Sequence, residues 1–503
     1  MTKLKSIFLF IFIVVTNCNA DDRVVLTTTA IADGKANNAV VFQREIDKLS
    51  ANGGGKLIVP AGNYVTGPIH LKSDVELHLE QGTCILGSTS RADYPISDAG
   101  ALINADNQQN ISITGNGVID GHGAELVKDI YAMLRAGKIE DAEWKRKRPL
   151  EHNRPKLLFL FQCNYVKVSG VTLKNASSWV SDFTHCSYVD IDSITIESTC
   201  YWNNDGIDLV NSSNVHIRNC NINCSDDGIC LKSEGKPSGI CENVWVENCT
   251  IRSSASAFKL GTGSYGGFRN IHVSNLFVYD TYRSAIALEC VDGGTLENVD
   301  VQNVVAKNSG NALLIRLGKR HEAVNGISKL EHVRITNVTA EISAEKPDIG
   351  YPIEGPLQKY LHNSFPASIT GVPGSIIRDI VLENIEITSL ANADIKKVCF
   401  LTDTLERVPE KIVAYPEFSM FGELPAWGLY VRHADSIQFK NIRFIQKGSD
   451  YRPCLIFDDV NNLMMNGVEV QAVKENTVVI LNNVGKYSLE NVSLPVRETK
   501  NKK

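Results

Sequence analysis

The sequence predicts an all-β protein, built as a right-handed, single-stranded parallel β-helix with an N-terminal capping helix. Three observations support this prediction. A segment of alternating apolar residues recurs about every 25 residues, its apolar columns align from copy to copy, and a turn separates its two short strands. The 503 residues are 43% apolar and 21% charged, which is typical of a globular chain. We therefore expect one solenoid domain over residues 21–503.

Residues 1–20 are expected to lie outside this fold, as a cleaved secretory signal. Two lysines precede an apolar run at 7–15, and Ala20 ends the segment with a small residue. The run is too short to span a membrane, and no later stretch reaches that length. We expect cleavage after Ala20 and a periplasmic or secreted protein. A lipid anchor at Cys18 is the alternative, although Asn17 is not the small residue that such a site prefers.

Charge and cysteine usage exclude some classes of function. The net charge of -6 gives no electrostatic footprint for nucleic acid. It leaves room for an acidic substrate, because a local basic cleft can override the net charge. The chain has 13 cysteines, and an exported protein could form disulfides. Their spacing contains no paired CxxC and predicts no zinc site. The sequence gives no information on oligomeric state.

Six segments of the chain align as copies of one repeating unit. Alternation with a period of two indicates strands, and a break within each copy indicates a turn between two of them. Asparagine fills that turn column, where it tolerates left-handed backbone and can hydrogen-bond to its copy in the next coil. An antiparallel sandwich, the alternative, would show hairpin turns rather than aligned columns. The first apolar column is Val166, Val189, Val215, Val244, Ile271 and Val299, and the turn column is Asn219, Asn248, Asn275 and Asn303.

The same alignment accounts for most cysteines and for the ends of the solenoid. Cys220 and Cys249 share an inward column, so we expect stacked core residues rather than a metal pair, and Cys163, Cys186 and Cys241 form a similar ladder. A solenoid also needs capped ends. Helical spacing of apolar residues within 37–56 predicts one cap, at Phe42, Ile46 and Leu49. A second helical pattern, at about 124–150, predicts an insert between coils. Its basic run 145–148 is expected to be a solvated helix end, with the lining of a cleft as the alternative.

A third strand in each coil carries an acidic motif that is written twice. Asp205-Gly-Ile and Asp227-Gly-Ile occupy the same position in adjacent coils, and Asp226 adds a third acid. Neighbouring strands lie about 4.8 Å apart, so the first two carboxylates should nearly share a site. Such crowding raises at least one pKa, which suits acid–base catalysis. A calcium site or a solvated turn is the alternative.

These motifs resemble glycoside hydrolase family 28, the polygalacturonase-like pectin hydrolases. Residues 203–206 match the family's N-x-D-G element, and 225–227 match most of its G-D-D element; the resemblance covers nearly the whole mature chain. It implies a right-handed parallel β-helix that hydrolyses with inversion and needs no cofactor or metal. It also implies that Asp226 is the general acid, that Asp205 and Asp227 hold the attacking water, and that Asn203 contacts the substrate.

The chain departs from the family at two other elements. Ser256 stands where the family has a histidine, and Ala287, Leu288 and Glu289 stand where it has R-I-K. Three basic residues on the same strand face are predicted to project outward and compensate. Together with Glu289 they would form a rearranged subsite for a galacturonate carboxylate, the alternative being ordinary exposed charges. These residues are Lys232, Lys259 and Arg316.

The sequence therefore predicts a secreted, inverting glycoside hydrolase that acts on pectic poly- or oligosaccharide, at a linkage containing galacturonic acid. Long inserts at 124–155, 343–375 and 400–428 could close one end of a groove. They favour exo-acting or rhamnogalacturonan-type cleavage over plain endo-polygalacturonase activity. A β-helix polysaccharide lyase with calcium and an arginine base is one alternative, and a non-catalytic glycan-binding β-helix is the other.

Overall fold

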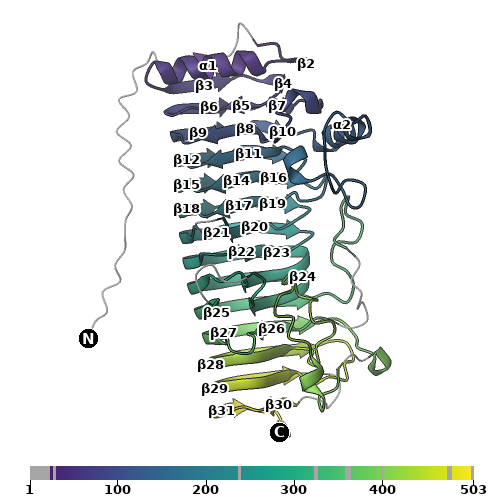
Figure 1. Cartoon of the computed structure of the whole chain (residues 1–503). Helices are drawn as coiled ribbons and strands as arrows, with labels where there is room; N and C mark the ends of the chain where they lie inside the picture. Colours follow the sequence, from purple (N-terminus) through teal and green to yellow (C-terminus); the bar gives the residue numbers. More distant parts are fainter. Residues whose placement is uncertain are drawn as a thin grey trace, which may run out of the picture.

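The chain winds into a parallel β-helix whose coils stack along one axis (Figure 1). The computed structural model describes residues 23–25, 30–235, 239–321, 327–356, 364–397, 400–472 and 478–499. The predicted signal segment, its cleavage after Ala20 and the alternative anchor at Cys18 lie outside these residues. Within the described ranges, no helix is both long and apolar enough to cross a membrane.

Three stacks of strands form the walls of the solenoid. The first stack contains β1 Arg23–Val25, β3 Gly55–Val59, β6 Val75–Leu79, β9 Gln109–Gly115, β12 Asn164–Ser169, β15 Ser187–Asp192, β18 Ser213–Arg218 and β31 Tyr487–Val492. The second contains β2 Asp33–Asn37, β4 Gly62–Thr66, β7 Thr83–Gly87, β10 Val118–Asp120, β13 Thr172–Lys174, β16 Thr195–Ser198 and β19 Asn221–Cys224.

The third stack carries the acidic motif. It contains β5 Ile69–His70, β8 Ala101–Asp106, β11 Lys156–Phe161, β14 Ser181–Thr184, β17 Ile207–Val210, β20 Ile229–Ser233, β22 Phe258–Ser264, β26 Ala367–Thr370, β30 Val479–Asn482 and β32 Val496–Thr499. Farther along the chain, long strands continue around the bends from one stack to the next. They are β21 Cys241–Ser253, β23 Gly267–Cys290, β24 Thr295–Leu317, β25 Lys329–Ile342, β27 Ile377–Ser389, β28 Leu429–Gln446 and β29 Leu455–Gln471.

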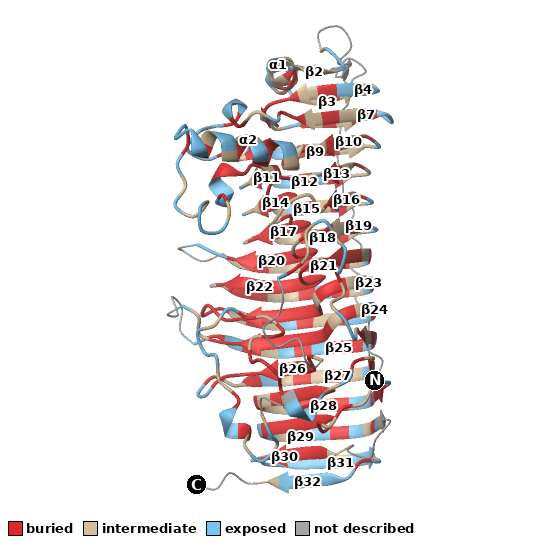
Figure 2. Ribbon diagram, turned by 90° about the vertical axis from the view of Figure 1, so that its right-hand side faces the viewer, coloured by how far each residue is buried: buried red, intermediate tan, exposed pale blue. Residues whose placement is uncertain are grey.

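The predicted columns are confirmed residue by residue. Val166 pairs with Val189, and the column continues in register to Val299. All the strand pairings between these described strands are parallel, which excludes the antiparallel sandwich. The column side chains are buried, and full burial of each valine or isoleucine contributes about 1.5–3 kcal/mol. Figure 2 shows this burial repeating along the stacked strands.

The asparagine ladder also forms as predicted. Asn219, Asn248, Asn275 and Asn303 have φ of 58°, 55°, 56° and 57°, which is the left-handed region. Each side-chain amide donates to the carbonyl oxygen of the preceding copy, over 3.4 Å to Asn219 and 3.0 Å to each of the next two. The turn residue thus satisfies its own polar group at the bend between two strand segments. The ladder continues through Asn337, Asn384 and Asn441.

The described cysteines follow the same interpretation. Cys220 and Cys249 are buried in adjacent coils, and so are Cys163 and Cys186; Cys241 is buried at the same position two coils after Cys186, with Ser212 between them. All eleven cysteines of the described residues carry free thiols. These positions are therefore packing positions inside the solenoid, as predicted.

Two helices accompany the strands. α1, Ala39–Ala51, buries Phe42, Ile46 and Leu49 and covers the N-terminal end of the solenoid, as predicted (Figure 1). α2, Gly123–Arg135, is shorter than the helix expected over about 124–150. Gly137 follows at a φ of 67°, a left-handed conformation that ends helices. The basic run 145–148 is therefore a loop rather than a helix end.

The inserts project from one side of the solenoid. Figure 1 shows α2 and the long connections of the C-terminal half along the same edge. The connection 400–428 packs onto the third stack through a small core of its own, which includes Leu405, Phe421, Leu424 and Tyr430. The insert after β10 packs through α2, with Trp144 partly buried against Ile130 and its neighbours. Both inserts therefore have a fixed place beside the third stack.

Candidate active site

The repeated Asp-Gly pair marks the point where the chain enters the third stack. Gly206 and Gly228 stand immediately before β17 and β20. A Cβ added at Gly206 would lie 2.4 Å from the carbonyl oxygen of Gly228, and one at Gly228 would lie 2.6 Å from that of Ala257. Adjacent coils approach too closely here for any side chain. The same geometry places the preceding aspartates one above the other.

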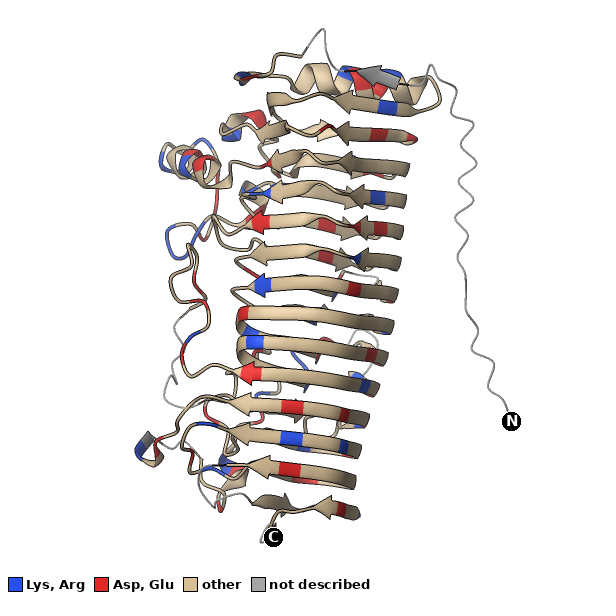
Figure 3. Ribbon diagram, turned by 180° about the vertical axis from the view of Figure 1, so that it is seen from behind, with Lys and Arg blue, Asp and Glu red and all other residues tan. Residues whose placement is uncertain are grey.

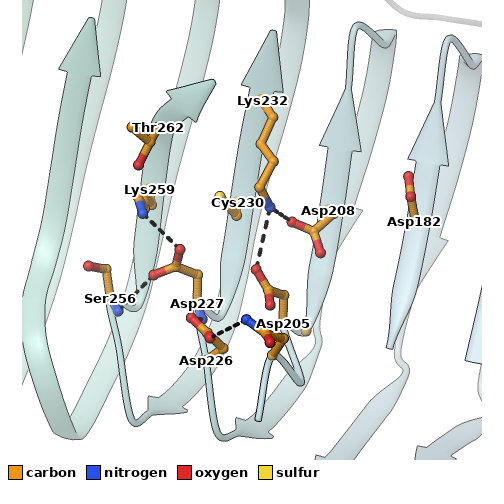
Figure 4. A network of polar contacts seen from close by, with 12 residues as sticks. Asp182, Asp205, Asp208, Asp226, Asp227, Cys230, Lys232, Ser256, Lys259 and Thr262 are labelled. Atoms are coloured by element: carbon orange, nitrogen blue, oxygen red, sulfur yellow. Dashed lines mark hydrogen bonds and ion pairs between the residues drawn. The ribbon is translucent and has the colours of Figure 1, made fainter. Parts of the chain in front are cut away.

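Asp205, Asp226 and Asp227 converge at this entry, as the alignment predicts (Figure 4). One oxygen from each carboxylate lies within 4.8 Å of the others. Asp205 and Asp227 are 5% and 4% exposed, whereas Asp226 is only half-buried. The acid that the family resemblance names as proton donor is therefore the one most accessible from outside.

The two neighbouring acids differ in their proton affinity. Burial and the charge of Asp227 raise the pKa of Asp226 above its usual range. Burial also opposes ionisation of Asp227, but Lys259, Arg283 and Lys232 outweigh it and hold that pKa below its usual range. Asp226 therefore keeps its proton at a pH where Asp227 is ionised. Pairs of titratable groups separated in this way are typical of an acid and a base in one active site.

Asp205 behaves as a third, strongly perturbed carboxyl. Burial raises its pKa well above the usual value, and the charges of Asp208 and Asp226 add to the effect. Lys232 opposes the shift from 3.4 Å. The Oδ1 atom of Asp205 is buried and has no hydrogen-bond partner among the described residues. An unsatisfied oxygen of this kind is expected to bind water or a substrate group.

The predicted basic residues reach the acids, but they are not exposed. Lys232 pairs with Asp208 and contacts Asp205, and it is 8% exposed. Lys259 is 2% exposed, and its Nζ donates to Asp227 Oδ2 over 2.9 Å. Each lysine thus neutralises an acid. Neither ammonium group is therefore free to bind a galacturonate carboxylate in the way that the sequence had predicted. Figure 4 shows both pairs.

Glu289 and Arg316 take separate places. Glu289 is 1% exposed, lies 3.9 Å from Lys259, and burial raises its pKa to about 7. It belongs to the same charge network. Arg316 is also 1% exposed, but its hydrogen bonds go to the backbone carbonyls of Thr370, Gly371, Glu410 and Lys411. It anchors the connection 400–428 rather than facing the carboxylates, so the prediction that it projects outward into a subsite is not supported.

Asn203 connects the acids to the insert after α2. Its backbone is left-handed, with φ at 59°, and its Nδ2 lies 3.4 Å from Asp226 Oδ2. Arg154 is buried and donates from Nη2 to Asn203 Oδ1 over 2.9 Å. Because Arg154 takes the carbonyl oxygen, the amide donor group is left to face Asp226. Arg154 is thereby a positioning residue for Asn203.

Arg283 is a site residue that the sequence reasoning missed. It is partly exposed, and its charge lowers the pKa of both Asp226 and Asp227. Its Nη2 lies 3.8 Å from Glu417, while its buried Nε has no partner among the described residues. The alignment contained the signal, because Asp226, Ala255 and Arg283 occupy one column over three coils. Arg283 is thus a cation close to the acids with unused hydrogen-bonding capacity.

Tyr415 and Asp208 were also missed, for different reasons. Tyr415 comes from the connection 400–428, and its hydroxyl accepts a 3.2 Å hydrogen bond from Lys259 Nζ. The repeat alignment locates strand residues only, so it could not predict where a residue of this loop would lie. Asp208 lies in β17, three residues after Asp205, on the outer face of the third stack, and burial raises its pKa to about 7. It could have been found as an acid on the same outward strand face.

The donor set does not match that of a divalent cation. Three carboxylates lie close enough to share an ion. However, Lys259 contacts Asp227 and Lys232 contacts Asp205, and a divalent cation would be repelled by both ammonium groups. Calcium also takes six to eight oxygen ligands. This arrangement favours proton transfer over metal binding.

Comparisons with known proteins agree with this geometry. The family described as glycosyl hydrolases family 28 matches residues 50–346. A probable polygalacturonase of Vitis vinifera is 26% identical over 322 residues, and an exo-poly-alpha-D-galacturonosidase of Dickeya chrysanthemi is 25% identical over 318 residues. The matches cover 60% and 52% of this chain, and the chain spans only 58% and 52% of these relatives' own lengths.

One solved structure extends the comparison to three dimensions. The hyperthermoactive exopolygalacturonase of Thermotoga maritima superposes with a TM-score of 0.58 at 26% identity, over 74% of this chain and 89% of that one. Three findings lead to the same family: the sequence match, the parallel β-helix, and the paired Asp-Gly turns that bring three aspartates together. The chain belongs to glycosyl hydrolases family 28.

Proposed function

We propose that this protein is an exported glycoside hydrolase that cleaves a galacturonic-acid-containing linkage of a pectic chain with inversion. The observation that carries the proposal is the opposite shift in pKa of Asp226 and Asp227, which are adjacent and share one site. Relatives that are named polygalacturonase and exopolygalacturonase support the substrate class. The basic and apolar segment within residues 1–20 supports export.

The proposed reaction uses the three aspartates as follows. Asp226 donates its proton to the glycosidic oxygen as the bond from that oxygen to the anomeric carbon breaks. Asp227 accepts a proton from a water, whose oxygen forms the new bond to the anomeric carbon from the opposite face. Asp205 orients this water through its unpartnered oxygen. The products are two saturated sugars, and Asp226 and Asp227 exchange protons with solvent to restart the cycle.

The stereochemistry needs its own test. The closest carboxylate oxygens lie within 4.8 Å, whereas most inverting enzymes separate their carboxyl groups by about 6.5–9.5 Å. Inversion at this short spacing requires that the water sit beside Asp205 and Asp227 rather than between opposed groups. A retaining enzyme would instead use one carboxylate as a nucleophile, and its product would keep the starting anomeric configuration.

A uronic acid substrate also requires a cation at the site. Lys232 and Lys259 are already paired, whereas Arg283 is partly exposed and lies close enough to Asp226 and Asp227 to lower both of their pKa values. We propose that Arg283 binds the substrate carboxylate in place of the family's R-I-K element. Guanidinium groups are suited to this role, because they form planar, charge-assisted hydrogen bonds with carboxylates.

The inserts support exo-acting cleavage. On one side of the acids, Arg154 ties Asn203 to the insert after α2. On the other side, Ser254 donates to the carbonyl oxygen of Ile353, and Lys259 contacts Tyr415. Loops on both sides of the carboxylates suit a chain end or a short oligosaccharide better than the middle of a polymer.

A polysaccharide lyase is the second candidate, because Arg283 stands where an arginine base could act. However, although burial opposes the effect, Tyr415 and the neighbouring carboxylates raise the pKa of Arg283, so its guanidinium stays protonated and is not available to accept a proton. The two lysines also disfavour the calcium that such chemistry uses. Both observations favour hydrolysis.

Product analysis on a panel of pectic substrates tests the proposal. Homogalacturonan, rhamnogalacturonan backbone and their oligosaccharides would be incubated with the wild-type protein, with Asp226→Asn and with EDTA. We expect saturated reducing sugars from at least one substrate, no effect of EDTA, and a loss of about 10²–10⁴-fold in Asp226→Asn. Asp300→Asn, on the first stack, is the matched control. An ultraviolet-absorbing unsaturated product that is lost with EDTA would make the protein a lyase, and silence on every substrate would favour a binding function.

A further inference from the structure

The loop that follows α2 lines an open pocket near the acids. The cavity has a volume of about 260 Å³ and includes the basic run of the loop together with Asn203. This size is just below the range for drug-sized ligands and suits one sugar unit. Its lining includes Arg146, Lys147, Arg148, Glu151, Arg154 and Asn203.

The loop is held in a fixed shape by Asp141. The carboxylate of Asp141 accepts hydrogen bonds from the backbone N–H groups of Glu143, Trp144 and Leu150, over 2.8, 2.9 and 2.6 Å. Asn153 donates a further bond to it, and Trp144 packs against the helix. These hydrogen bonds to a single carboxylate hold the two ends of the loop together. The basic side chains therefore start from a preorganised backbone rather than from a loose tail.

Positive charge predominates in the pocket, and part of it is unpaired. Arg146 is paired with Glu143 over 2.6 Å. Arg148 lies over the ring of Trp202, at 5.1 Å from its centre, and neither it nor Lys147 has an acidic partner within ion-pair distance among the described residues. Figure 3 shows basic residues gathered on this loop, beside α2. An anionic ligand would meet two cations, Arg148 and Lys147, that have no ion-pair partner among the described residues.

Asn203 connects the pocket to the three acids. This side chain lines the pocket, and its Nδ2 also lies 3.4 Å from Asp226 Oδ2. Arg154 fixes the orientation of the Asn203 side chain through the hydrogen bond to its Oδ1. A sugar chain whose scissile bond lies at Asp226 and which extends past Asn203 enters the basic pocket with its next units.

We infer that this pocket is a second carboxylate-binding subsite, in which Arg148 and Lys147 receive an acidic sugar of the chain that Asp226 cleaves. The inference rests on the proposed function, since that function supplies the substrate class. It adds that the enzyme selects substrates with a uronic acid beyond the scissile bond. A neutral or esterified sugar at that position would lose these contacts.

Direct binding tests this subsite independently of catalysis. Trigalacturonic acid and its carboxyl-reduced counterpart, a galactose trimer, would be titrated by calorimetry into the inactive Asp226→Asn protein. We expect Arg148→Gln or Lys147→Gln, added to that background, to weaken binding of trigalacturonic acid about tenfold, the value of one charge-assisted hydrogen bond. Binding of the galactose trimer should not change. Arg148→Lys, which keeps the charge, should retain most of the affinity if the protein is folded.

Lys138→Gln provides the matched control, since Lys138 is an exposed lysine of the same insert that does not line the pocket. The inference is overturned if trigalacturonic acid does not bind, if Arg148→Gln binds it as well as the parent does, or if the galactose trimer loses affinity equally. If the variants weaken binding as expected but the wild-type protein hydrolyses no pectic substrate, the proposed function is overturned and the subsite is still supported.

Discussion

At the scale of single residues, one lysine lowers the pKa of Asp227, the proposed base, relative to that of Asp226, the proposed acid. Asp226 and Asp227 are consecutive in the chain and both lie close to Asp205, but only Asp227 receives the ammonium group of Lys259 at 2.9 Å. A cation at that distance favours the ionised form and lowers the carboxyl pKa. The division of roles therefore depends on Lys259, which a family comparison based on the aspartates alone would not reveal.

Replacing Lys259 should change the pH profile in a defined direction. Lys259 lowers the pKa of Asp227, so Lys259→Met should raise that pKa, and the base will then be protonated at a higher pH. The acid side of the kcat/KM profile should shift to higher pH. The other side, where Asp226 loses its proton, should move less. The pH dependence of kcat/KM, measured for the wild type and for Lys259→Met in the same buffers, tests this prediction. Lys167→Met, on the first stack, is the control. An unchanged pKa on the acid side of the Lys259→Met profile would contradict the prediction.

A substitution at Arg283 should affect binding of the substrate carboxylate. Arg283→Gln removes one bidentate, charge-assisted contact, worth about 1.5–3 kcal/mol, so KM should rise about 10- to 100-fold. The loss should be much smaller with a carboxyl-reduced substrate. Arg269→Gln is a suitable control, since Arg269 forms an exposed pair with Glu242, and such pairs are worth little. Equal losses on acidic and reduced substrates would refute the role of Arg283.

Individual acids were predictable, whereas their partners were not. The repeated Asp-Gly placed Asp205 and Asp227 together from the column alignment alone. The same alignment put Lys232 and Lys259 on the correct face, but a strand column does not say which side chains turn toward each other, and both lysines pair with acids. Arg316 was wrongly placed in the subsite for a related reason, since its partners come from a loop with no repeat.

At the scale of elements, the asparagine ladder contributes to stability in a way that can be measured. Asn275 donates to Asn248 and accepts from Asn303, in a left-handed conformation. Asn275→Ala should lose both bonds and add backbone strain, for a total of about 2–4 kcal/mol. Asn275→Gly should lose the bonds while relieving the strain, so its destabilisation should be smaller. Urea denaturation midpoints for the two variants test this order, and equal stability to the wild type would contradict it.

Strands were predictable here because each coil repeats the last. A period of two, read in six aligned copies, specified both the columns and the turn between them. The inserts offered no copy to align. The helix over about 124–150 was overestimated because one left-handed glycine, Gly137, outweighed a continuing helical pattern. The loop that it starts lines a pocket, so for the basic run 145–148 the structure favours the cleft lining that the sequence offered as the alternative.

At the scale of the whole molecule, the solenoid provides a straight wall, and we propose that the inserts determine which substrates it accepts. The loops at 124–155 and 400–428 lie along one side of the solenoid (Figure 1). Arg154 of the first loop contacts Asn203, and Tyr415 of the second contacts Lys259, so both loops lie beside the acids. The chain carries a net charge of -6, yet the groups that we propose bind the substrate, Arg283, Arg148 and Lys147, are basic. Local charge, rather than net charge, accounts for an acidic substrate.

This arrangement predicts how a polymer is degraded. If the loops admit only chain ends, homogalacturonan should release monomer or dimer from the start of the reaction, while viscosity falls slowly. Size analysis of early products, alongside viscometry, measures both. A rapid loss of viscosity with a broad range of oligomers would show that the loops leave an open groove, and would favour endo cleavage.

The central claim is that Asp226 and Asp227 act as acid and base on an α-linked galacturonate chain. Proton NMR of a fresh digest of galacturonic acid oligosaccharides tests it most directly, because one spectrum reports cleavage, product chemistry and configuration. The account predicts a saturated reducing end that appears first as the β anomer and then mutarotates. An α anomer as first product would make one carboxylate a nucleophile, and an unsaturated product would replace hydrolysis with elimination; either result would contradict the account.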